Sequence, residues 1–70
     1  MKYKNLAAEL ARRGMSKKDL VEELSKRGVK ISYTTLWRIM CGKSKISLKE
    51  ALVMAEIFEV SPKYLFEEEV

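Results

Sequence analysis

The sequence predicts an all-α fold, a compact five-helix domain that covers residues 1–70. A chain of this length suffices for one small hydrophobic core. Its apolar residues recur at the three- and four-residue spacing of helices that bury one face. Four times, an apolar residue precedes a serine and another apolar residue follows the serine by four positions. This pattern is typical of a helix start with a capping side chain and a hydrophobic staple.

The serine pattern predicts where four of the five helices begin. The serines are Ser16, Ser32, Ser47 and Ser61. Glu50 follows the third serine by three residues and completes a capping box, and Asp19 stands in the same relation to the first. Pro62 directly follows the last serine, at the first helical position, where its missing N–H costs nothing.

The expected helices span residues 3–13, 17–27, 33–41 and 48–58, with a last turn or two from residue 62. Gly14 ends the first of them in the left-handed conformation. The residues expected to face the core are Tyr3, Leu6, Ala7, Leu10 and Ala11, then Leu20, Val21 and Leu24, then Leu36, Ile39 and Met40, then Leu48, Ala51, Leu52, Ala55 and Phe58.

Helix 48–58 has more apolar surface than one buried face requires. Val53, Met54 and Ile57 lie outside its expected inward stripe. Either of two structures can cover these side chains: a C-terminal turn through residues 64–66 that folds back onto the helix, or a second copy of the chain in a homodimer. We expect the turn to cover most of these side chains, because a small helical domain needs all the core it can form.

The charge of the chain is strongly asymmetric. Residues 1–49 carry 13 Lys and Arg against 4 Asp and Glu, a net charge of +9. Residues 50–70 carry 1 against 6, a net charge of −5. Such asymmetry is expected where one face meets a polyanion while the C-terminal part stays off it or meets another protein. The alternative is that these charges only form a solvated surface and bind no partner.

Composition argues against several other functions. The chain has no His, one Cys, no glycine-rich phosphate loop and no identifiable carboxylate pair, so we expect neither an enzyme nor a metal or cofactor site. It offers no evident small-molecule site. No apolar run approaches a membrane span and no signal peptide is recognisable, so we expect a cytoplasmic protein that does not bind membranes.

The short helix 33–41 is the candidate for reading DNA. Its apolar face points inward while Thr34, Thr35, Trp37 and Arg38 point away. The planar fork of Arg38 suits guanine O6 and N7, and threonine methyl groups suit the thymine methyl. Because the outward face has no Asn or Gln, bidentate adenine recognition is not available. Trp37 either packs against the core or an interface, or contacts DNA.

The order and spacing of these motifs resemble the phage-repressor and Cro-like helix-turn-helix DNA-binding family, across nearly the whole chain. The similar segments are residues 15–20, 34–39 closing at 42–43, 47–48 and 60–66. The resemblance implies a small repressor- or Cro-like transcriptional regulator of phage or bacterial origin, associated with the nucleoid. It also implies a homodimer that binds a palindromic operator in double-stranded DNA, with residues 33–41 as the recognition helix.

The resemblance also implies which residues contact DNA. The base-reading residues would be Ser32, Tyr33, Thr34, Thr35, Trp37 and Arg38. The phosphate-binding candidates are Ser16, Lys17, Lys18, Lys43 and Lys45. The helix N-terminus that follows Ser16 offers free N–H groups and a positive dipole to a phosphate oxygen. For each lysine, a free surface charge is the alternative.

Three features depart from the family pattern. About five extra residues, 25–29, predict a second helix that is longer by about a turn and a longer connection to the third. Leu10 and Met40 stand where the family often holds a buried Arg and Glu, so we expect them to touch in the core. Cys41 stands where an Asn near a phosphate is frequent, which removes one expected backbone contact.

A protein-interaction module is the alternative function. The same fold would then bind a protein partner, as an antirepressor or antitoxin does, through helix 48–58 and the acidic Glu67, Glu68 and Glu69. Salt distinguishes the two functions. Binding to phosphates through lysine and arginine weakens steeply with salt, whereas an apolar helix interface is much less sensitive.

Overall fold

The computed structural model describes residues 2–68 and contains five helices and no strand in that range. Met1, Glu69 and Val70 lie outside it. The helices are α1 (Lys4–Arg12), α2 (Lys17–Lys26), α3 (Tyr33–Met40), α4 (Leu48–Phe58) and α5 (Pro62–Leu65). The all-α prediction is confirmed, and the expected boundaries differ from these by at most one residue. Within residues 2–68, no helix combines the length and apolar character that crossing a bilayer requires.

The four predicted helix starts are confirmed as serine caps. The side chains of Ser16, Ser32, Ser47 and Ser61 each accept a hydrogen bond of 3.1 Å from the backbone N–H three residues later. In α2 and α4 the box is complete, because Asp19 and Glu50 each accept a bond of 2.9 Å from the backbone N–H of the capping serine. These contacts span three residues, which is why the sequence alone predicts them.

Helices α1 to α4 are each followed by a left-handed residue. Gly14, Gly28 and Gly42, which follow α1, α2 and α3, have φ angles of 63°, 85° and 80°. Helix α4 instead ends at Glu59, whose φ of 56° places an L side chain in a conformation that favours glycine.

The connection from α2 to α3 runs through residues 27–32. Gly28 turns the chain, and the N–H of Val29 then donates to the carbonyl of Leu24 at 2.9 Å while the Val29 side chain is buried. Of the extra residues noted in the sequence, Ser25 and Lys26 belong to α2 and the others form the turn.

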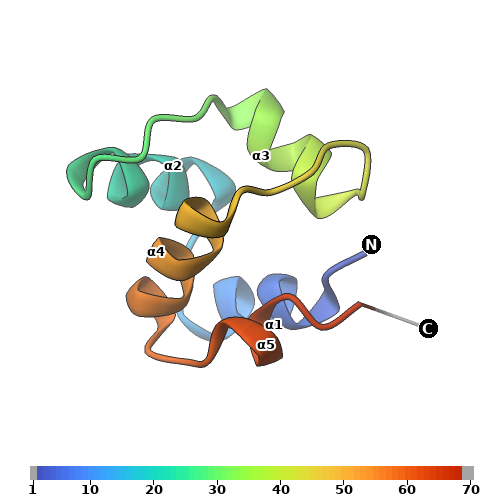
Figure 1. Ribbon diagram of the computed structural model, residues 1–70. Coiled ribbons are helices and arrows are strands. Elements are labelled where there is room, and N and C mark those ends of the chain that lie inside the picture. Colours follow the sequence, from blue (N-terminus) through green and yellow to red (C-terminus); the bar gives the residue numbers. More distant parts are fainter. Residues whose placement is uncertain (1, 69–70) are drawn as a thin grey trace.

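The helices are arranged around α4, with α2 and α3 on one side and α1 and α5 on the other (Figure 1). Helices α1 and α5 contact each other although they lie far apart in the sequence. The two ends of the described chain lie on the same side of the molecule, where Lys2 and Glu68 form an ion pair of 3.2 Å. The Lys2 N–H also donates to the carbonyl of Met40, at the end of α3.

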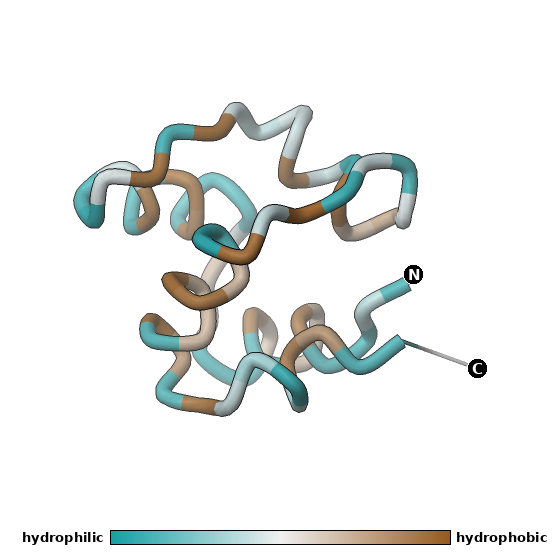
Figure 2. Tube along the Cα trace, viewed as in Figure 1, coloured by the Kyte–Doolittle hydropathy of each residue, from teal (hydrophilic) through white to brown (hydrophobic). Residues whose placement is uncertain are grey.

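One hydrophobic cluster fills the space between the helices, and Figure 2 shows hydrophobic and hydrophilic residues interspersed along the chain. Leu10 and Met40 are both buried members of this cluster, and the expected direct contact between them stays a prediction. The C-terminal turn folds back on α4, because α5 contacts α4 and Leu65 is buried, but Val53 and Ile57 stay half-buried and the Phe66 ring meets the Tyr3 ring edge-on at 5.3 Å. The buried apolar residues are Tyr3, Leu6, Leu10, Leu20, Leu24, Val29, Leu36, Ile39, Met40, Met54, Ala55, Phe58 and Leu65.

The expected inward face of α4 is partly wrong. Leu48 and Leu52 are 75% and 46% exposed, and Met54 takes a core position that was not assigned to it. Ala55 and Phe58 are buried as expected. Apolar residues surround much of this helix, so its periodicity does not define one face, and the packing against α2 and α5 decides which side is buried.

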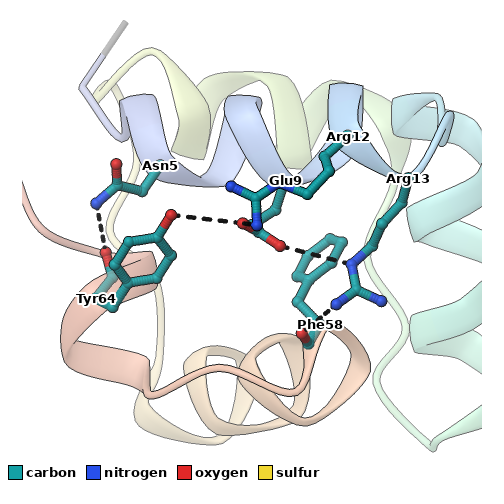
Figure 3. A network of polar contacts seen from close by, with 6 residues as sticks. All are labelled: Asn5, Glu9, Arg12, Arg13, Phe58 and Tyr64. Atoms are coloured by element: carbon teal, nitrogen blue, oxygen red, sulfur yellow. Dashed lines mark hydrogen bonds and ion pairs between the residues drawn. The ribbon is translucent and has the colours of Figure 1, made fainter.

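In α1, Ala11 is exposed and Glu9 is buried, which corrects the expected inward stripe. Glu9 is 1% exposed and faces two arginines: its Oε2 lies 3.0 Å from Arg12 Nη1, and its Oε1 lies 3.6 Å from Arg13 Nε (Figure 3). The Tyr64 hydroxyl donates to Glu9 Oε2 at 3.4 Å, and Arg13 Nη2 donates to the carbonyl of Phe58. The network ties α1 to both α4 and α5.

Candidate nucleic-acid interface

Helix α3 is anchored by one face and leaves the other exposed. Leu36, Ile39 and Met40 are buried, while Thr34 and Arg38 are exposed. This division follows from the 3.6-residue repeat and matches the expected one except at Thr35, which was expected to point away and is half-buried. The exposed side therefore presents a hydroxyl and a guanidinium on a short helix that is held rigidly from behind.

Two aromatic side chains lie on the same exposed surface. Tyr33 is 53% exposed and Trp37 is 41% exposed, so neither is a core residue. The Lys43 ammonium lies over the Trp37 ring, 5.3 Å from its centre, as a cation–π contact. Trp37 thus packs against the loop after α3 and keeps part of its ring open to solvent.

Ser32 and Thr35 differ from Thr34 because the α3 cap uses their hydroxyl groups. The Ser32 hydroxyl accepts from the Thr35 N–H and lies 2.9 Å from Thr35 Oγ1, to which it donates. Thr35 is also half-buried. Their first role is to fix the start of α3, whereas Thr34 is exposed and takes no part in the cap.

The N-terminus of α2 carries Lys17 and Lys18 directly after the capping serine. Asp19 belongs to the same capping box, so a carboxylate lies beside the two ammonium groups. The backbone N–H of Ser16 holds the pKa of Asp19 below its ordinary value of 3.8, with further lowering from the Ser16 side chain and from the charge of Lys18. The first N–H groups of α2 have no partner inside the helix and point outward.

An open hollow of about 370 Å³ joins the two helix starts. Tyr33 from α3 lines it together with Ser16, Lys17 and Lys18 from α2. Leu10, Met15 and Met40 form part of its apolar floor, with Ala7 and Ala11 of α1. The structure therefore brings three of the predicted phosphate-binding residues next to one predicted base-reading residue. A second hollow, of about 560 Å³, lies beside α5; it is lined by none of the predicted DNA-contacting residues but includes Glu67, which the alternative protein-interaction function named.

The loop after α3 holds the other two predicted phosphate residues. The N–H groups of Lys43 and Ser44 both donate to the carbonyl of Arg38, at 2.8 and 3.3 Å, so the loop folds back on the last turn of α3. Gly42 makes this turn possible because its φ of 80° is a conformation that L side chains rarely adopt; a Cβ there would also lie 2.8 Å from the Lys2 side chain. Lys45 is exposed further along the loop, and no contact joins it to the hollow.

The basic side chains divide into paired and unpaired sets. Ion pairs within residues 2–68 engage Lys2, Arg12, Arg13, Lys26 and Arg27. Within the same residues, none of the predicted DNA-contacting cations, Lys17, Lys18, Arg38, Lys43 and Lys45, forms an ion pair with an acidic side chain. Lys30 also lacks one and is exposed just before the α3 cap. Lys30 was not among the residues predicted to contact DNA, although its place two residues before Ser32 was a usable signal.

The chain has no significant match among models of known protein families, among curated proteins or among solved structures.

Proposed function

We propose that this protein is a sequence-specific DNA-binding transcriptional regulator that places α3 in the major groove of double-stranded DNA. The observation that carries the proposal is the hollow at which Lys17 and Lys18 of α2 meet Tyr33 of α3. A groove-reading helix needs phosphate contacts close to its start, because these contacts set its register on the duplex.

The contacts divide into two kinds. Lys17, Lys18, Lys43 and Lys45, with the Ser16 end of α2, would contact phosphates and supply affinity without sequence preference. The exposed surface of α3, formed by Tyr33, Thr34, Trp37 and Arg38 with the capping Ser32 and Thr35, would face the base edges. Arg38 is the residue best suited to one base, because it can donate two hydrogen bonds to guanine. Two copies on a palindromic operator would supply the specificity that one small module lacks.

The first experiment selects bound sequences from a random duplex library and then titrates salt against the best one. We expect a palindromic site rich in guanine and thymine. The logarithm of the affinity should fall linearly with the logarithm of salt concentration, because phosphate contacts release counterions. No enrichment together with a flat salt response would contradict the proposal.

Single substitutions separate the two kinds of contact. Arg38→Ala should relax the preference at one guanine and cost about 1 to 3 kcal/mol at that position. Lys17→Ala should weaken all sequences alike and lower the salt slope by about 1. Lys63→Ala, on α5, is the matched control and should change neither quantity. An equal loss on Lys63→Ala and Lys17→Ala would show a nonspecific charge effect.

A further inference from the structure

The solvent side of α4 carries an unusual apolar strip. Leu48 and Leu52 lie one helical turn apart and are the two most exposed leucines of the described chain, at 75% and 46%. Val53 and Ile57, also one turn apart, are half-buried and pack partly against the core. Single exposed apolar residues are ordinary, but two exposed leucines together with two half-buried apolar neighbours on one short helix leave an apolar surface that a partner can cover.

Two opposite charges lie on the same side of α4. Lys49 and Glu56 are both exposed and are separated by two helical turns, so they lie on one line along the helix, about 10 Å apart. Neither forms an ion pair within residues 2–68. Leu52 and Val53 lie between them.

The helix itself does not account for these two charges. Lys49 lies in the first turn of α4, where the positive end of the helix dipole disfavours a cation. Glu56 lies in the last turn, where the negative end disfavours an anion. Each charge is thus at the less favourable end, and a partner of complementary charge outside the helix would offset that.

We propose that this face binds a second copy of the chain, with the two α4 helices antiparallel about a two-fold axis that passes between residues 52 and 53. Lys49 and Glu56 are equally distant from that point, so reversing the helix places each Lys49 opposite a Glu56. Two symmetric ion pairs then flank a centre in which Leu52 meets Val53. A parallel pairing would instead bring like charges together, and so the charge pattern selects the antiparallel arrangement.

The dimer would place two α3 helices on one palindromic site, and this use of it rests on the proposed function. The pairing of the two α4 helices does not. The surface is formed by one helix from each copy, so the association is of the weak, small-interface class. None of the four residues at the centre of the surface, Lys49, Leu52, Val53 and Glu56, is among those proposed to contact DNA.

The test measures mass in solution without DNA, by sedimentation equilibrium from about 1 μM to about 1 mM protein. The wild-type mass should rise from 8.1 kDa toward twice that value. Lys49→Glu and Glu56→Lys each place like charges in both symmetric pairs, so each should weaken association about tenfold. An equimolar mixture of the two variants should restore it, because every pair between unlike variants is then opposite in charge.

Both variants should fold normally, since each places a charge at the end of α4 that the helix dipole favours. Circular dichroism checks this, and Lys63→Glu, on α5, is the control that should leave association unchanged. A wild-type mass that stays at 8.1 kDa throughout, or a mixture that associates no better than its components, would overturn the inference. Binding of the wild type and of Arg38→Ala to a single half-site of DNA tests recognition without the dimer. Failure of the dimer and failure of the proposed function are therefore distinguishable.

Discussion

At the scale of single residues, Asp19 combines two opposing effects. Its carboxylate completes the α2 cap with a 2.9 Å bond from the Ser16 N–H, which stabilises the helix start. The same carboxylate adds a negative charge beside Lys17 and Lys18, where a phosphate is proposed to bind. The capping contact and the proposed DNA contact therefore compete electrostatically at one place.

The capping role of Asp19 predicts a specific pH dependence. Because the folded-state pKa lies below the ordinary value of 3.8, the unfolded chain binds the proton more readily. The stabilisation is fully present above the ordinary value and is lost as the pH falls through the folded-state pKa. Chemical denaturation of the wild type and Asp19→Asn between about pH 2 and pH 7 should show unfolding free energies that converge in acid. A constant difference across that range would contradict this prediction.

At the scale of helices, the ends differ more than the starts. Every helix from α2 to α5 begins at a serine, but α4 ends at Glu59 whereas α2 ends before Gly28, both in the left-handed conformation. An L side chain pays a steric cost in that conformation, and glycine does not.

Reciprocal substitutions test this cost. Glu59→Gly should raise the free energy of unfolding by up to about 1 kcal/mol, because the relief of strain exceeds the entropy that glycine adds to the unfolded chain. Gly28→Ala should lower it by about 1 kcal/mol through backbone strain alone, since an added Cβ would meet no atom within 4 Å. Midpoints of urea unfolding measure both. A lower midpoint for Glu59→Gly would show that the Glu59 side chain stabilises the helix end.

Helix starts and ends were predictable because their signals are local. The Ser16 cap needs only Asp19, three residues away, and the left-handed residue after α1 is a glycine that can be read directly. The buried face of α4 was not predictable in full, because Leu48 and Leu52 are as apolar as the residues that α2 and α5 cover. Glu9 was missed for a similar reason: its burial depends on Arg13 and Tyr64, and the second of these lies 55 residues away.

At the scale of the whole molecule, Arg13 is the residue that joins α1 to α4. Its guanidinium faces buried Glu9, lies over the Phe58 ring at 5.5 Å and donates to the Phe58 carbonyl at the negative end of the α4 dipole. Arg12 pairs with the same Glu9 but is far more exposed.

Removing the two arginines one at a time separates these roles. Arg13→Ala should lower the free energy of unfolding by about 1 to 2 kcal/mol, because it removes a charged hydrogen bond to a backbone carbonyl and a cation–π contact. Arg12→Ala is the matched control and should cost less than about 1 kcal/mol, as is usual for exposed ion pairs. Thermal and urea unfolding give both values, and equal losses would mean that the Phe58 carbonyl contact contributes nothing.

In the candidate site too, features that depend on neighbouring residues were predictable from the sequence, and features that depend on how distant segments pack were not. The exposure of Thr34 and Arg38 on α3 follows from helical spacing, so the sequence was enough to predict it. The meeting of Tyr33 with the start of α2 depends on how the two helices pack, and local sequence patterns do not determine that packing. The contact of Lys43 with Trp37 depends on the fold of the loop between them.

The seam between α1 and α5 has a kinetic consequence. Asn5 donates to the carbonyl of Tyr64 across 59 residues of chain, whereas each helix cap spans three. Closing so long a loop is entropically expensive and is repaid only when the rest of the chain is in place. Helix α5 should therefore dock last during folding and detach first during unfolding, and its contacts set how fast the molecule opens more than how fast it forms.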